Sequence, residues 1–190
     1  MSRFEFRWSV HKWRAIACLL LGLRARAADA FAEMVEAYPN DIYALSSLAH
    51  LKAELGDPAA AIRLYERALV QPGATAAMWF NLAFLQEQRQ DLEGAETSFR
   101  NALAISDTLD RAWYGLGLVL IQLGRLDEAV DCLKRNTKLQ PMSPYAWYQL
   151  ARVHIDRHEP DEALKIIQHL KGFEPKFAAQ LERETGLKAS

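Results

Sequence analysis

Cysteine is scarce in this sequence, since Cys18 and Cys132 are the only two among 190 residues. Two cysteines supply no disulfide framework, and both fall in segments expected to be helical, so we interpret them as small buried hydrophobic residues. An excess of charge is also absent, because 23 Lys and Arg residues are matched by 24 Asp and Glu residues. A net charge of −1 argues against a surface that binds nucleic-acid phosphates.

The apolar run at residues 15–23 is too short to span a bilayer, which requires about 20 apolar residues. It follows a basic stretch, residues 1–14, and precedes Ala25, Arg26 and Ala27. This order resembles a secretory signal. If residues 1–27 act as such a signal, the protein is periplasmic or membrane-associated; otherwise we expect it to be cytoplasmic.

No catalytic pattern is visible in the sequence. Gly22, Gly56 and Gly124 are isolated turn residues rather than parts of a phosphate-binding loop. His154 and His158 lie one helical turn apart, but no third ligand completes a metal site, so we interpret them as a packed histidine and a turn histidine. We therefore expect no enzyme, no metal and no cofactor.

A 34-residue period is present throughout most of the chain. It relates Trp79 to Trp113 and Trp147, and it recurs at small residues. The small residues of one register position are Ala27, Ala61, Ala95, Ala129 and Ala163. A fixed period of this length indicates stacked helical hairpins, whose two helices approach closely only where small residues such as Gly117 and Ala129 face each other.

The same register extends into the N-terminal segment. Counting back by 34 residues places Ala15, Gly22, Ala27 and Phe31 at the small, turn and aromatic positions of a first hairpin. A cleaved leader has no reason to follow this register. We therefore favour a retained helical hairpin and a cytoplasmic protein.

Several helix starts are visible as an N-cap residue followed by proline. Asp57 precedes Pro58, Ser143 precedes Pro144 and Glu159 precedes Pro160. The Asp57 side chain can accept bonds from unpaired amides, and proline is favoured at the first helical position. We expect the other two pairs to start helices in the same way.

The pattern W-x2-L-G-x2-Y, then A-x3-F, then P, resembles the tetratricopeptide repeat family. The repeats are assigned to residues 8–41 (degenerate), 42–75, 76–109, 110–143 and 144–177, with a tail at 1–7 and a capping helix and tail at 178–190. The resemblance implies an all-α, right-handed superhelix of about five hairpins plus the capping helix. Because His158 replaces glycine at the turn position, we expect a less tight turn in the last repeat.

In the resembled family, the first helix of each repeat lines a concave groove. Its exposed side chains occupy the second, fifth, sixth, ninth and twelfth repeat positions. The candidate partner-binding residues on this basis are Tyr43, His50, Phe80, Asn81, Phe84, Arg111, Tyr114, Leu118, Tyr145, Tyr148 and Arg152. An aromatic and aliphatic lining favours a protein-interaction adaptor that binds an apolar-aromatic peptide or helix, although some of these rings are expected to pack against neighbouring helices.

One specific variant of this function is rejected. Family members that bind acidic chaperone tails use Lys, Asn, Asn, Lys and Arg over three repeats. The matching positions here hold Ser46, His50, Asn81, Arg111 and Gly115. Only Asn81 and Arg111 retain the required chemistry, so we keep these two as contacts to a peptide backbone or a single acidic group.

Two alternatives to the adaptor remain. The basic N-terminus and the face that carries Ile16, Leu19 and Leu20 could dock to a membrane-associated or envelope assembly. The aromatic tail with Phe4, Phe6 and Trp8 could instead fill the groove of a second copy, which would make the protein a homo-oligomer.

Overall fold

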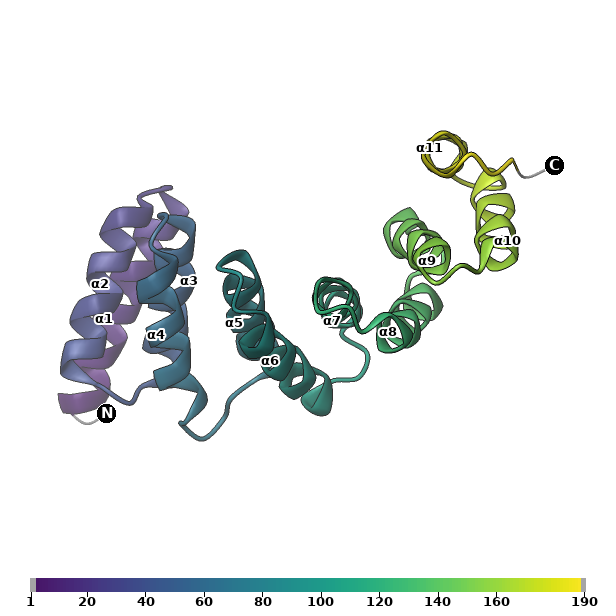
Figure 1. The fold of residues 1–190 in the computed structure, drawn as a ribbon. Coiled ribbons are helices and arrows are strands. Elements are labelled where there is room, and N and C mark those ends of the chain that lie inside the picture. The colour runs from purple at the N-terminus through teal and green to yellow at the C-terminus, as the bar shows by residue number, and fades with distance from the viewer. Residues whose placement is uncertain (1–2, 189–190) are drawn as a thin grey trace. The chain divides into compact units, whose positions relative to one another are not determined.

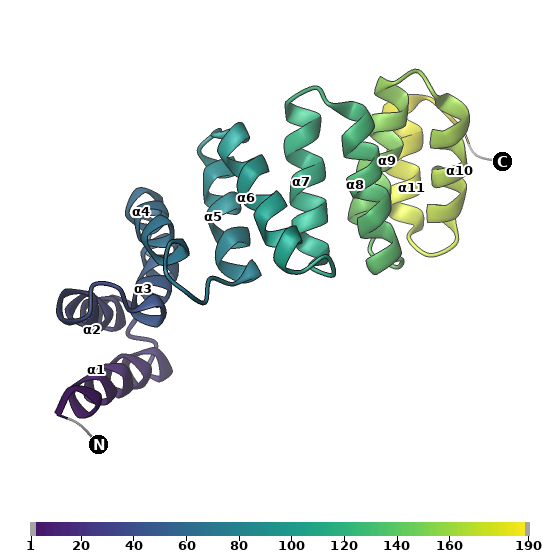
Figure 2. The same ribbon diagram turned by 90° about the horizontal axis from the view of Figure 1, so that it is seen from below.

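The computed structural model describes residues 3–188, with side chains from residue 7 onward. Over these residues the chain is all-helical and contains eleven helices and no strand (Figures 1 and 2). The helices are α1 (Arg3–Leu20), α2 (Arg24–Ala37), α3 (Ile42–Glu54), α4 (Pro58–Leu69), α5 (Ala76–Gln88), α6 (Leu92–Ile105), α7 (Asp110–Gln122), α8 (Leu126–Leu139), α9 (Pro144–Asp156), α10 (Pro160–Lys171) and α11 (Pro175–Thr185).

The chain divides into two compact units, residues 1–91 and residues 92–190. In the first, α1 to α5 pack one after another, and α3 also contacts α5. In the second, α6 to α11 pack in the same sequential way, and α9 also contacts α11. The repeat register pairs α5 with α6, yet the boundary between the two units falls between these helices.

Every repeat has a left-handed residue at the same register position. Gly22, Gly56 and Gly124 have φ angles of 71°, 83° and 73°. Gln90 and His158 occupy the equivalent positions and have φ angles of 62° and 61°. The expectation of a looser turn at His158 is therefore wrong, because the histidine adopts the glycine conformation at a steric cost of about 1–2 kcal/mol.

The predicted N-terminal hairpin is present as α1 and α2, which pack against each other. Ala15 and Ala27 are fully buried between them, and Phe31 is 1% exposed. Helix α1 already begins at Arg3, so most of the stretch that was expected to be a tail is helical. None of the helices in the described part of the chain is long and apolar enough to cross a membrane.

Close helix contacts in the second unit depend on glycine. A Cβ atom added to Gly115 would lie 2.4 Å from the ring of Phe99, which is itself 1% exposed. A Cβ atom on Gly117 would lie 3.0 Å from the side chain of Leu133 on α8. At both contacts, the large side chain on one helix fits only because the facing position on the other helix is glycine.

The register tryptophans lie at the edge of the core, where Trp79 and Trp147 pack against its buried residues. Trp113 and Trp147 are half-buried rather than enclosed. The Trp113 indole donates a hydrogen bond to the carbonyl of Asp107 at 2.7 Å, and the Trp147 indole donates to the carbonyl of Pro141 at 2.9 Å. Trp113 and Trp147 therefore each fix the loop that precedes their own helix.

Helix capping follows the prediction at one of three places. The Asp57 carboxylate accepts a bond from the Ala60 amide at 3.0 Å, ahead of Pro58. Ser143 and Glu159 precede a proline but make no side-chain capping bond. The Glu159 carboxylate instead lies 2.6 Å from Nδ1 of His154, which satisfies this buried ring.

The second unit ends with α11, which covers apolar surface of α9 and α10. Ala178 and Leu181 on α11 are fully buried. The helix ends at Thr185, because Gly186 follows it in a left-handed conformation with φ 74°. Helix α11 thus occupies the place that the first helix of a further repeat would take against α9.

Truncation of Phe99 should destabilise the second unit. Phe99→Ala leaves a cavity at the α6–α7 contact, so we expect the free energy of unfolding of the full chain to fall by about 3–5 kcal/mol in chemical denaturation. Ile105→Ala is the matched control, because Ile105 lies on the same helix but is 53% exposed. Equal losses from the two variants would contradict the assigned packing.

Relief of the left-handed strain should stabilise the protein. We expect His158→Gly to raise the free energy of unfolding by up to about 1 kcal/mol, because glycine adopts positive φ without a clash. Gly124→Ala, at the equivalent position, should lower it by a similar amount. A lower melting temperature for His158→Gly than for the wild type would contradict the strain that we assign to the left-handed histidine.

Candidate functional site

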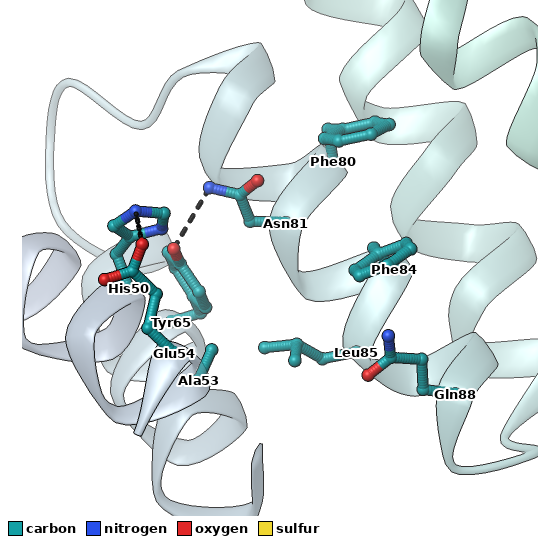
Figure 3. A pocket seen from close by; sticks show the side chains of 9 residues that line it. All are labelled: His50, Ala53, Glu54, Tyr65, Phe80, Asn81, Phe84, Leu85 and Gln88. Atoms are coloured by element: carbon teal, nitrogen blue, oxygen red, sulfur yellow. Dashed lines mark hydrogen bonds and ion pairs between the residues drawn. The ribbon is translucent and has the colours of Figure 1, made fainter. Parts of the chain in front are cut away.

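A pocket of about 360 Å³ lies between α3 and α5 of the first unit (Figure 3). We call it the α3–α5 pocket. Helix α4 contributes one residue to it and the other two helices contribute the rest. Its lining consists of His50, Ala53, Glu54, Tyr65, Phe80, Asn81, Phe84, Leu85 and Gln88.

The apolar wall of this pocket comes mainly from α5. Phe80 and Phe84 stand one helical turn apart on the same face, as residues separated by four positions do (Figure 3). Phe84 is 47% exposed, whereas Leu85 reaches toward the core and is 5% exposed. The pocket therefore offers an aromatic surface that is accessible to a ligand, on a helix anchored by buried side chains.

A polar pair at the back of the pocket connects α4 with α5. The Asn81 Nδ2 atom donates a hydrogen bond to the Tyr65 hydroxyl at 3.0 Å. Tyr65 is 2% exposed, and burial raises the pKa of its phenol because the phenolate would lose hydration, while the bond from Asn81 acts in the opposite direction. The tyrosine thus stays neutral and holds the Asn81 amide in place.

The rim of the α3–α5 pocket carries charge. Nε2 of His50 lies 3.5 Å from Oε1 of Glu54, and Arg24 Nε lies 3.0 Å from Oε2 of the same carboxylate. His50 and Glu54 also line a second hollow of about 320 Å³. The other residues of this second hollow are Leu19, Gly22, Arg24, Phe31, Tyr43, Ser47 and Leu51. The two hollows of the first unit therefore meet at one histidine–glutamate pair.

Tyr43 belongs to an aromatic cluster inside the first unit. Its ring lies 6.1 Å from Trp8 and 5.8 Å from Phe31, and the ammonium of Lys12 lies 4.8 Å from its centre. The Trp8 indole donates to the Asp41 carboxylate at 2.8 Å. Trp8 was expected to fill the groove of a second copy, but it packs within its own chain instead. The side chains of Phe4 and Phe6 lie outside the described residues.

In the second unit, three candidate residues meet at a smaller hollow of about 190 Å³. Arg111, Tyr114 and Tyr145 line it together with Asp110, Asn136, Gln140 and Ser143. Buried Asn136 donates to the carbonyl of Asp110 at 2.7 Å. Leu118 is half-buried on α7 and does not line this hollow.

Tyr148 contacts the final helix, and Arg152 contacts Tyr148. The Tyr148 hydroxyl donates to Glu184 at 2.6 Å and accepts from Gln180 at 3.1 Å. Its ring lies 5.8 Å from Phe177, and the Arg152 guanidinium lies 5.9 Å from its centre. The bond from Tyr148 also lowers the pKa of Glu184. Tyr148 thus has a packing role within its own unit.

The structure brings four of the candidate residues together in the α3–α5 pocket: His50, Phe80, Asn81 and Phe84. Sequence reasoning missed Glu54, Tyr65, Leu85 and Gln88 as members of this pocket. Tyr65 was recognisable, because its register position otherwise holds Phe31, Phe99 and aliphatic residues. A hydroxyl at a buried apolar position requires a partner.

No cluster of metal ligands is assembled in the described part of the chain. No three His, Cys, Asp or Glu side chains converge there on a common point that could hold a metal ion. Burial raises the pKa of the Cys132 thiol to about 11, which keeps it protonated and unreactive. Cys18 is half-buried and unpaired with Cys132.

Family models match the chain in two overlapping stretches. A model described as tetratricopeptide repeat matches residues 47–110. A model of subunit 3 of the anaphase-promoting complex, cyclosome, matches residues 88–170. No curated protein matches the sequence significantly.

Solved structures share the fold at low sequence identity. The chain is similar to the crystal structure of MamA protein with 18% identity and a TM-score of 0.83, covering 96% of this chain and 97% of that one. It is similar to MamA 41-end from Desulfovibrio magneticus RS-1 with 17% identity and a TM-score of 0.78, covering 95% and 97%. It is also similar to YrrB, titled a TPR protein with an unusual peptide-binding site, with 16% identity and a TM-score of 0.81, covering 89% and 88%.

The Tyr65–Asn81 bond should be measurable as a coupling energy. Tyr65→Phe removes the hydroxyl, and we expect it to cost about 1 kcal/mol of unfolding free energy in the wild-type background. In the Asn81→Ala background the same change should cost less, because the partner is already gone. Equal costs in both backgrounds, measured by urea denaturation, would contradict the bond.

Proposed function

The chain is a tetratricopeptide repeat protein, and from this premise we propose that it is a non-catalytic adaptor for a partner protein. The proposed ligand is a peptide or helix that places an apolar or aromatic side chain in the α3–α5 pocket. The observation that carries this proposal is the combination of exposed Phe84 with the adjoining hollow of about 360 Å³.

The size of the pocket supports one or two side chains as the buried part of the ligand. Its volume of about 360 Å³ is near the lower end of the range for ligand sites, roughly 300–1,000 Å³. Burial of a half-exposed phenylalanine ring against a ligand side chain is favourable at about 25 cal/mol per Å². The contact at Phe80 and Phe84 would therefore supply most of the affinity.

The polar residues of the pocket support recognition of a peptide main chain. The Asn81 side-chain amide donates one hydrogen to Tyr65. Its second N–H and its carbonyl oxygen can bond to a ligand. His50, Glu54 and Gln88 add further donors and acceptors to the lining. A central apolar contact with a polar border is the usual composition of a protein interface.

Two further observations bear on the ligand class. The peptide-binding site named for YrrB, a solved structure with a similar fold, favours a peptide over a small molecule. In the second unit, the hollow at Arg111, Tyr114 and Tyr145 is proposed as an additional contact region. Tyr43 and Tyr148 are left out of the proposed contact because their rings are half-buried and pack within their own units. Tyr145 is kept because it is 60% exposed, although its ring also contacts Phe177.

The test is selection of displayed random peptides on the immobilised full chain. We expect the selected peptides to share a large apolar or aromatic residue. In fluorescence anisotropy, Phe84→Glu should weaken their binding at least about tenfold, as loss of a central interface contact does. Tyr145→Ala, measured in the same way, tests whether the second unit contributes to peptide binding, since weaker binding by this variant would indicate a contact there.

The matched control is Val70→Glu, because Val70 is also exposed, at 79%, and lies in the first unit outside the pocket. This variant should bind the selected peptides as the wild type does. Absence of any selected peptide, or equal binding by the wild type and Phe84→Glu, would overturn the proposed site.

A further inference from the structure

The turn between α1 and α2 exposes consecutive leucines. Leu20 and Leu21 are 83% and 74% exposed, and Leu19 and Leu23 beside them are 41% and 39% exposed. We call residues 19–23 the leucine turn. Single exposed leucines are ordinary on protein surfaces, but four at one hairpin tip form a continuous apolar projection.

The apolar surface continues from this turn along the outer face of α1. Val10, Trp13, Ala17 and Leu20 follow one another at separations of three and four residues, which places them on one side of the helix. Val10 is 49% exposed and Trp13 is 65% exposed. The opposite side of α1 packs inward through Ala15, so this helix has one buried face and one exposed apolar face.

The same segment is strongly basic. Residues 3–26 contain six arginine or lysine residues and one glutamate, a formal charge of +5 in a chain whose net charge is −1. Arg14 and Arg24 are paired with Glu33 and Glu54 on neighbouring helices. Arg7 and Arg26, near the two ends of the segment, are exposed.

We propose that the α1–α2 hairpin binds an anionic lipid surface. The leucine turn and Trp13 enter the boundary between headgroups and acyl chains, while the basic side chains contact anionic headgroups. Helices that lie in a membrane interface combine these features, with apolar and aromatic residues on one face and arginine or lysine around it. The leucine turn and Trp13 do not line the α3–α5 pocket, although Leu19 and Gly22 line the second hollow, which adjoins this pocket at His50 and Glu54. A lipid-bound adaptor would therefore keep Phe80 and Phe84 accessible.

Charge complementarity selects lipid over a second copy as the occupant. Two copies that met through this face would bring together two hairpins that each have a formal charge of +2, since residues 3–37 contain six Arg or Lys residues and four Asp or Glu residues. Like charges at close approach oppose association, whereas a negative lipid surface attracts the same residues. An acidic protein partner would satisfy the charge but would be distinguished by the experiment below.

The experiment is flotation of the full chain with vesicles. We expect binding to vesicles of phosphatidylcholine mixed with phosphatidylserine, little binding to phosphatidylcholine alone, and release at high salt, which screens the attraction. Leu20→Asp combined with Leu21→Asp should reduce binding at least about tenfold. Both positions are highly exposed, so the thermal melt of the variant should match that of the wild type.

Val70→Asp combined with Met142→Asp is the matched control, since it introduces the same two charges at exposed apolar positions outside the α1–α2 hairpin. It should float as the wild type does. The proposal is overturned if the wild type does not bind the mixed vesicles or if the leucine variant binds them unchanged. It is also overturned if the wild type is a dimer in light scattering that the leucine variant converts to a monomer without any lipid binding.

Discussion

The structure depends on a left-handed residue that recurs every 34 residues, at positions 22, 56, 90, 124 and 158. This conformation closes the turn between the two helices of a repeat within a few residues. Since the turn is short, the positions at which small residues face each other are fixed. Glycine satisfies the conformation without strain at three of these positions, and Gln90 and His158 adopt it despite their side chains.

The candidate site contains a residue type that the other repeats do not have at the same register position. Position 65 carries a tyrosine where related positions carry phenylalanine or aliphatic residues. Its buried hydroxyl requires a partner, and Asn81 on α5 provides the bond. The pair fixes the back of the pocket, while Phe80 and Phe84 on the same helix form the accessible wall. Thus one helix contributes both to the core and to the surface that we propose binds a peptide.

The fold was largely predictable from sequence because its determinants are local and periodic. The hairpins and the turn positions follow from residues that recur at fixed spacing. The stop of α11 follows from a single glycine, Gly186, at its C-terminal end. The family-model matches to tetratricopeptide-type repeats confirm this prediction. The tryptophans were harder to assign, because a period shows that a residue packs but not that Trp113 uses its indole to hold a loop carbonyl.

The site was only partly predictable because spacing does not reveal what covers a side chain. Tyr148 occupies a position that would face a groove, but Glu184 and Gln180 of α11 bind its hydroxyl. Glu54 and Gln88 were not predicted as pocket residues because they are the last residues of α3 and α5. The groove positions of the repeat family do not include these two. The division of the chain into two units after residue 91 also could not be predicted, because the repeat pattern continues unchanged across this point.

The most direct measurement of the central claim is methyl-resolved NMR of the full chain during titration with a peptide that binds it. The account predicts saturable shifts of the Ala53 and Leu85 methyl signals, which lie in the α3–α5 pocket. The methyl signals of Ile167 and Leu181, buried in the second unit, should stay unchanged. Shifts confined to residues outside the pocket would contradict it.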